Sequence, residues 1–206
     1  MVSIPDRAQS FISHWRRDFG IFVGAFLLSL TLSGEALPPF LITDLEGETR
    51  QIGGASHTKA HVFVFILHDC PISNQYQPKI RRLAEAYASK GVQFHLVYAD
   101  PDMTSSAALA HAKDFGILAP AYLDPKHALV DRLEAEVTPE AFVIDDQNQI
   151  QYRGRIDNLY YKLGRKRSQA SEHDLQDALD EILAGSKVSQ PRTQAIGCYI
   201  PRRDGS

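Results

Sequence analysis

The sequence contains only two cysteines, Cys70 and Cys198, among its 206 residues. Two thiols are too few for a disulfide scaffold, but they suffice for one disulfide, a redox pair or part of a metal site. Their spacing does not resemble a zinc finger. The chemistry of this chain is therefore expected to depend on one or two individual sulfur atoms.

The sequence also lacks a strong charge of either sign, since 22 basic residues face 25 acidic ones. It has no internal repeat and no basic patch interleaved with aromatic residues, so we expect no nucleic-acid partner. The short basic run at residues 165–167 is flanked by polar residues and is predicted to be a solvated loop. The length and the hydrophobic content of 44% are ordinary for one globular domain.

Residues 1–36 resemble a targeting segment. Arg7, Arg16 and Arg17 precede an uncharged apolar run at residues 21–32, and small residues occur at Gly34 and Ala36. The run is shorter than the roughly 20 apolar residues that span a bilayer, so a signal peptide is predicted, with an uncleaved membrane anchor as the alternative. Part of a twin-arginine signal is also present. Export would place the chain in the periplasm or cell envelope, where a disulfide persists.

The remaining residues predict a chain that mixes strands and helices. Apolar runs bounded by turn residues predict the strands, and apolar spacing with capping residues predicts the helices. Ser171 and Asp174 resemble a capping box, and residues 159–170 are predicted to be a polar loop. The expected strands are residues 40–43, 49–52, 61–67, 92–98, 141–144 and 150–155, and the expected helices are 73–89, 105–115, 128–134 and 172–183.

Cys70 is the most reactive candidate in the sequence. It follows a buried strand and precedes Pro71 and a helix, and the free N–H groups at a helix N-terminus favour a thiolate. Asp69 opposes this effect with its negative charge, and His68 would offset Asp69 if protonated. The alternative is a buried structural thiol at the end of a strand, which is a common place for a free cysteine.

The order of several motifs resembles the redoxin, or peroxiredoxin-like, branch of the thioredoxin fold. Residues 70–73 stand in the place of the family's C-x-x-C motif, with Ser73 as its second position. Pro78 occupies the place of a helix-kinking proline, and Thr138-Pro139 resembles the cis-proline loop. The resemblance implies a three-layer α/β fold, with a mixed central sheet flanked by helices and an N-terminal hairpin.

A narrower resemblance is to exported bacterial redoxin domains, carried by residues 70–74, 152–157 and 197–201. It implies a redoxin domain at residues 37–185 and a C-terminal tail at residues 186–206 that carries Cys198. The implied activity is thiol–disulfide exchange with a protein or a small-molecule thiol, without a bound cofactor. The electron donor is not assigned.

The same resemblance implies roles for five residues. Cys70 is expected to be the attacking thiolate, and Thr138 and Pro139 are expected to shape the substrate surface. Ser73 replaces a local partner cysteine, so it either donates a hydrogen bond to the thiolate or caps the helix. Any resolving thiol is then Cys198, on the tail, with a free surface cysteine in a loose tail as the alternative.

Two other activities remain open. The first is peroxide reduction, but peroxiredoxins carry Thr or Ser where this chain has Leu67. Arg153 and Arg155 are candidate groups near the sulfur, and the alternative for both, which is more common on a strand, is a surface or salt-bridged position. A copper chaperone of related fold would use Cys70, Cys198 and His68, because soft thiolate and imidazole ligands suit Cu(I). A non-enzymatic module that only docks partners is the third alternative.

Overall fold

The computed structural model describes residues 37–53 and 58–202. The predicted targeting segment at residues 1–36 lies outside the described residues. Within the described part, no helix is both long and apolar enough to cross a membrane.

Every strand and helix predicted above is present, and several short strands are added. The strands are β1 (Phe40–Asp44), β2 (Thr49–Ile52), β3 (Ala60–Ile66), β4 (Val92–Tyr98), β5 (Ala121–Leu123), β6 (Val137–Thr138), β7 (Glu140–Asp145), β8 (Ile150–Gly154), β9 (Tyr160–Lys162), β10 (Arg165–Lys166) and β11 (Cys198–Tyr199). The helices are α1 (Pro71–Ala88), α2 (Ser105–Asp114), α3 (Ala128–Leu133) and α4 (Asp174–Leu183).

Seven strands form one mixed sheet in the order β2-β1-β5-β4-β3-β7-β8. Strands β3, β4 and β5 are parallel, and β1 pairs antiparallel with both β2 and β5. Strand β7 pairs antiparallel with β3 on one side and with β8 on the other. The predicted mixed sheet, including its N-terminal hairpin, is therefore confirmed.

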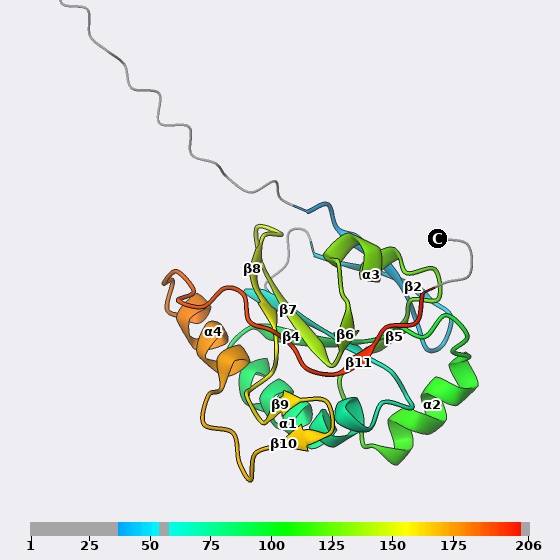
Figure 1. Cartoon of the computed structure of the whole chain (residues 1–206). Coiled ribbons are helices and arrows are strands. Elements are labelled where there is room, and N and C mark those ends of the chain that lie inside the picture. Colours follow the sequence, from blue (N-terminus) through cyan, green and yellow to red (C-terminus); the bar gives the residue numbers. More distant parts are fainter. Residues whose placement is uncertain (1–36, 54–57, 203–206) are drawn as a thin grey trace, which may run out of the picture. The chain divides into compact units, whose positions relative to one another are not determined.

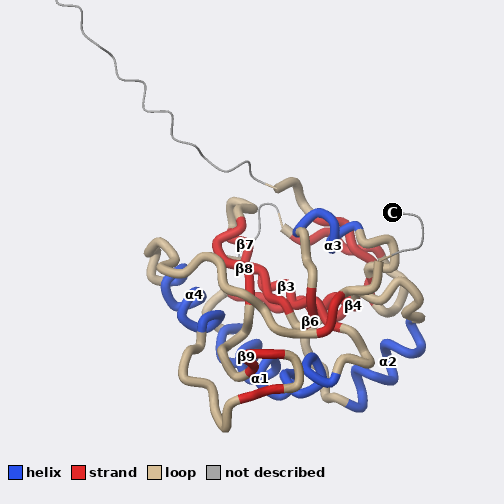
Figure 2. The backbone as a smooth tube through the Cα atoms, viewed as in Figure 1, coloured by secondary structure: helices blue, strands red, loops and turns tan. Residues whose placement is uncertain are grey.

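Helices cover both faces of this sheet (Figure 1). Helix α1 connects β3 to β4 and α2 connects β4 to β5, and right-handed crossovers that advance in one direction place both helices on the same face. In Figure 1, α1 and α2 lie below the sheet, α4 lies at its left and α3 lies above it. The tube in Figure 2 shows the same three layers.

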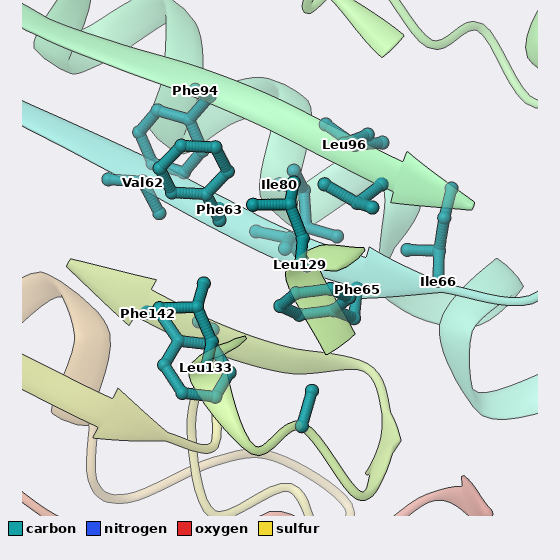
Figure 3. Close-up of a cluster of buried hydrophobic side chains, with 14 of the residues drawn as sticks. Val62, Phe63, Phe65, Ile66, Ile80, Phe94, Leu96, Leu129, Leu133 and Phe142 are labelled. Carbon is teal, nitrogen blue, oxygen red and sulfur yellow. The ribbon is translucent and has the colours of Figure 1, made fainter. Parts of the chain in front are cut away.

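The core fills both faces of β3, all seven residues of which are buried. Val62 is in register with Phe94, and they belong to the buried cluster that includes Ile80 of α1 (Figure 3). Phe65 packs edge-on against Phe142 of β7, with ring centroids 5.5 Å apart. A strand buried on both faces carries an almost continuous apolar run, which is why the sequence predicted β3 correctly.

The C-terminal segment lies against the domain at three places. Arg153 donates its backbone N–H to Pro191, and Thr193 donates to the carbonyl of Arg153. Strand β11 then pairs antiparallel with β6, and Ile200 donates to the carbonyl of Glu136. The part of the predicted tail that is described therefore follows the edge of β8 and crosses to β6.

Three local expectations were wrong. Helix α1 begins at Pro71, because Cys70 is its N-cap and proline suits the first helical position. The Ser171 capping box does not form, since the Ser171 hydroxyl accepts a hydrogen bond from Asn158 at 2.9 Å and His173 precedes α4 without a side-chain cap. The predicted polar loop contains the β9–β10 hairpin, which turns at Gly164.

Candidate functional site

Cys70 lies at the N-terminus of α1, where β3 has ended. Its sulfur accepts a hydrogen bond from the backbone N–H of Ser73 at 3.4 Å, so the thiol itself caps the helix. The interpretation that Ser73 caps the helix is therefore wrong. The side chain of Cys70 is 1% exposed, which means that solvent reaches this sulfur only if a covering segment moves.

The Thr138–Pro139 loop lies directly beside Cys70. The peptide bond between these two residues is cis, as the resemblance implied. The Cys70 thiol donates to the carbonyl oxygen of Thr138 at 3.3 Å. The structure therefore brings Cys70, Ser73, Thr138 and Pro139 together at one place.

Two buried hydroxyl groups at this place lack a hydrogen-bond partner among the described residues, namely Ser73 Oγ and Thr138 Oγ1. Both residues are fully buried, and both side chains lower the pKa of the Cys70 thiol. A buried hydroxyl without a partner costs free energy. These hydroxyls are placed to donate once the sulfur carries a negative charge.

Cys198 reaches the same place from the other end of the chain. It is in register with Thr138, the residue whose carbonyl accepts from Cys70. Gly197 makes this approach possible, because a Cβ atom at residue 197 would lie 1.9 Å from the Thr138 carbonyl oxygen. Gly154 allows a second close approach, because a Cβ atom at residue 154 would lie 2.3 Å from the carbonyl and hydroxyl oxygens of Thr193. The absence of a side chain at these two glycines therefore allows the C-terminal segment to pack against the site.

The two thiols have opposed pKa shifts. Burial raises the pKa of Cys70, but hydrogen bonds from Cys198 and Ser73 and the nearby Thr138 hydroxyl outweigh it, and the net pKa lies below its ordinary value. Burial, together with the hydrogen bond to Cys70 and the charges of Cys70 and Asp69, raises the pKa of Cys198 to about 12. Of the two thiols, Cys70 therefore has the lower pKa.

The charged residues next to Cys70 act differently from the prediction. Asp69 acts on Cys198, whose pKa it raises. The Nδ1 atom of His68 lies 3.3 Å from Oδ2 of Asp100 rather than beside Asp69. In residues 37–53 and 58–202, no three His, Cys, Asp or Glu side chains are grouped as a metal site requires. The described geometry therefore adds nothing in favour of the copper interpretation.

The two arginines considered for peroxide chemistry bind carboxylates. The Arg153 guanidinium donates to Glu140 at 3.3 Å, and the Arg155 guanidinium donates to Asp174 at 2.8 Å. Neither contact involves the Cys70 sulfur. The surface or salt-bridged interpretation of both arginines is confirmed.

A buried cluster that the sequence interpretation gave no role ties α1 to the chain after β8. The Tyr76 hydroxyl donates to Asp157 at 2.5 Å, and Lys79 forms an ion pair with the same carboxylate. Tyr160 donates to Gln75 of α1, and burial and the nearby charge of Cys70 raise the pKa of Tyr160. Asp157 and Gly197 lie within the sequence motifs on which the resemblance to exported redoxin domains rests. That resemblance was the only signal in the sequence that either residue has a role at the site.

Comparisons with known proteins agree with this geometry. The Redoxin family model matches residues 32–160. No curated protein matches the sequence.

Solved structures share the fold at low sequence identity. A hypothetical protein from Sinorhizobium meliloti is 23% identical with a TM-score of 0.73, covering 84% of this chain and 95% of its own. An uncharacterized conserved protein from Geobacillus kaustophilus is 24% identical with a TM-score of 0.71, covering 84% and 93%. A candidate thiol:disulfide interchange protein, DsbE, from Chlorobium tepidum is 17% identical with a TM-score of 0.58, covering 73% and 96%. The predicted thioredoxin-like fold is confirmed.

Proposed function

The chain belongs to the redoxin family, and on this premise we propose that it is a thiol–disulfide oxidoreductase in which Cys70 attacks and Cys198 resolves. The observation that carries the proposal is the meeting of the two cysteines, which lie far apart in the sequence, at Thr138. Their opposed pKa shifts support these roles, because the thiolate is the nucleophile in disulfide exchange.

The reaction proceeds in two exchange steps. The Cys70 thiolate attacks one sulfur of a substrate disulfide; the Cys70–substrate bond forms, the substrate disulfide breaks, and the leaving thiolate takes a proton. Cys198 then gives up its proton and attacks the Cys70 sulfur, which releases the second substrate thiol. The substrate gains two electrons and the protein becomes the Cys70–Cys198 disulfide. An external thiol donor returns the protein to the dithiol, and the same steps in reverse oxidise a dithiol substrate.

Substrate access requires movement of β11. Cys70 is almost fully buried, whereas Cys198 is partly exposed. Strand β11 has only two residues, so lifting it from β6 breaks few backbone hydrogen bonds. Short, partly exposed segments of this kind open at low free-energy cost. We assign to β11 the gating of access to the Cys70 sulfur.

An insulin reduction assay with dithiothreitol as the donor tests this function. The wild-type chain is expected to accelerate insulin precipitation, and Cys70→Ser is expected to abolish the acceleration. Cys198→Ser is expected to trap a mixed disulfide on Cys70, which mass spectrometry detects after acid quenching. Equal rates for wild type and Cys70→Ser would refute the proposal.

The proposal includes export, with residues 37–185 as the redoxin domain. The pattern of residues 1–36 supports export, and an oxidising compartment would maintain the Cys70–Cys198 disulfide. Fractionation of cells that express the full chain, followed by N-terminal sequencing, tests this point. Processing just after Ala36 is expected for a cleaved signal, whereas an intact N-terminus in the membrane fraction would identify an anchor.

A further inference from the structure

A polar groove of about 590 Å³ lies along β11, the strand that carries Cys198, although neither cysteine lines the groove itself. One wall is the chain on both sides of Cys198, including Gly197 and Tyr199, and the other includes Tyr161, Lys162 and Leu163 of the β9–β10 hairpin. We propose that this groove, together with the hairpin, binds an acidic peptide segment that carries the exchanging cysteine. This inference rests on the proposed function and names the substrate class for it.

The charges around the groove favour an acidic occupant. Lys162 and Arg192 line it, and within residues 37–53 and 58–202 neither side chain has an ion-pair or hydrogen-bond partner. Three further cations follow Lys162 closely in the sequence. They are Arg165 and Lys166 of β10 and the next residue, Arg167.

The acidic residues nearby offset only part of this positive charge, although Glu134 also pairs with Arg153 at 3.4 Å. Glu140 lines the groove, but Arg153 pairs with it at 3.3 Å. Exposed Glu136 is the other carboxylate in the groove wall. The excess of basic groups therefore attracts a ligand that supplies carboxylates, most strongly at low ionic strength.

The rim of the groove indicates a peptide rather than a small anion. Three large apolar or aromatic side chains stand exposed there: Tyr161 at 51%, Leu163 at 54% and Tyr199 at 74%. Tyrosine is enriched in protein interfaces, where it supplies contact area and a hydroxyl group. A small dianion would leave these side chains unused, whereas an extended segment contacts them while its carboxylates meet the cations.

The hairpin wall of the groove is held in place before the substrate arrives, whereas the β11 wall belongs to the segment that moves. The Tyr160 hydroxyl donates to Gln75 of α1, and its ring lies 5.9 Å from that of Tyr76. The Arg167 guanidinium donates to the carbonyl of Asn158 and lies 5.2 Å from the ring centroid of Tyr161. The prediction that residues 165–167 form a solvated loop misses this arrangement.

Peptide exchange kinetics test the inference. Three peptides of equal length carry one central cysteine as a mixed disulfide with thionitrobenzoate, flanked by glutamate, serine or lysine. Their reaction with the reduced full chain is followed by thionitrobenzoate release and divided by the rate with mercaptoethanol, which corrects for intrinsic reactivity. We expect the acidic peptide to react about tenfold faster than the basic one at low salt, as two or three exposed charge contacts allow, and the ratio to approach one at high salt.

Charge reversal provides the matched comparison. Lys162→Glu with Arg192→Glu is expected to reduce the acidic-to-basic ratio at least threefold. Lys113→Glu with Lys126→Glu changes the net charge equally, at exposed residues that do not line the groove, and is expected to leave the ratio unchanged. An equal loss in both double variants would overturn the inference.

The remaining outcomes separate this inference from the proposed function. Equal rates for the three peptides with the wild-type chain would overturn the inference alone. No reaction with any peptide would overturn the proposed function, and the inference with it. Equal peptide rates, combined with binding to phosphatidylglycerol vesicles that is lost on reversal of Lys162 and Arg192, would instead assign the surface to an anionic membrane.

Discussion

Cys70 and Cys198 are chemically distinct thiols although they meet at one place. The Cys70 thiol lies at a helix N-terminus beside the hydroxyls of Ser73 and Thr138. Burial and the negative charges of Cys70 and Asp69 raise the pKa of Cys198. Because a low pKa also makes a better leaving thiolate, the external thiol donor that reduces the Cys70–Cys198 disulfide is expected to attack Cys198 and expel Cys70.

The thiolate absorbance of Cys70 tests this asymmetry. The difference in far-ultraviolet absorbance between wild type and Cys70→Ser is expected to titrate with a midpoint below the ordinary thiol value of 9.0. Cys198→Ala removes a hydrogen-bond donor to the Cys70 thiolate, so the midpoint of that variant is expected to rise. An unchanged or lower midpoint in Cys198→Ala would show that Cys198 does not stabilise the thiolate.

Sequence patterns predicted the long elements well and the short ones poorly. Strand β4 was predicted with its observed ends, since its apolar residues are bounded by Gly91 and Asp100. Strand β11 was not predicted, because it is two residues long and its partner β6 lies far away in sequence. The position of Cys70 at a helix N-terminus was readable locally, but the meeting with Cys198 depends on this non-local pairing.

Gly197→Ala tests how far the site depends on the docking of β11. The added Cβ would collide with the Thr138 carbonyl oxygen, and overpacking of this kind costs about 1–3 kcal/mol. We expect lower stability in urea unfolding and a reduced yield of the Cys70–Cys198 disulfide. Gly47→Ala is the control, because nothing lies within 4 Å of its added Cβ, so any effect of its positive φ arises without a collision at the Thr138 carbonyl. An equal disulfide yield in both variants would contradict a role for Gly197.

The stability of the fold as a whole is expected to depend on two buried histidines on the neighbouring strands β3 and β4. His61 Nδ1 and His95 Nε2 are 3.0 Å apart, and His95 Nδ1 lies 3.3 Å from the Tyr122 hydroxyl. Burial, and to a lesser degree the charge of His61, lowers the pKa of His95 to about 3. Burial also lowers the pKa of His61. Both side chains are therefore neutral in the folded protein at neutral pH.

Acid is expected to destabilise the protein through this pair. In the unfolded chain a histidine has a pKa of about 6.5, so between pH 6.5 and 3 the unfolded state binds more protons than the folded state. The contribution to the free energy of unfolding is fully present above pH 6.5 and is lost as the pH falls, by about 2 kcal/mol at pH 5 for His95. Urea unfolding at pH 7.5 and pH 5 is expected to show a smaller loss in His95→Gln than in wild type. Equal losses would contradict this account.

The pairing of the two cysteines is tested most directly by peptide mapping. The full chain is oxidised with diamide, remaining thiols are alkylated, and the protein is digested without reduction and analysed by mass spectrometry. The account predicts one crosslinked peptide that joins the segments containing Cys70 and Cys198, and its disappearance after reduction. Two alkylated cysteines in the oxidised monomer would contradict the central claim that Cys70 and Cys198 form a redox pair.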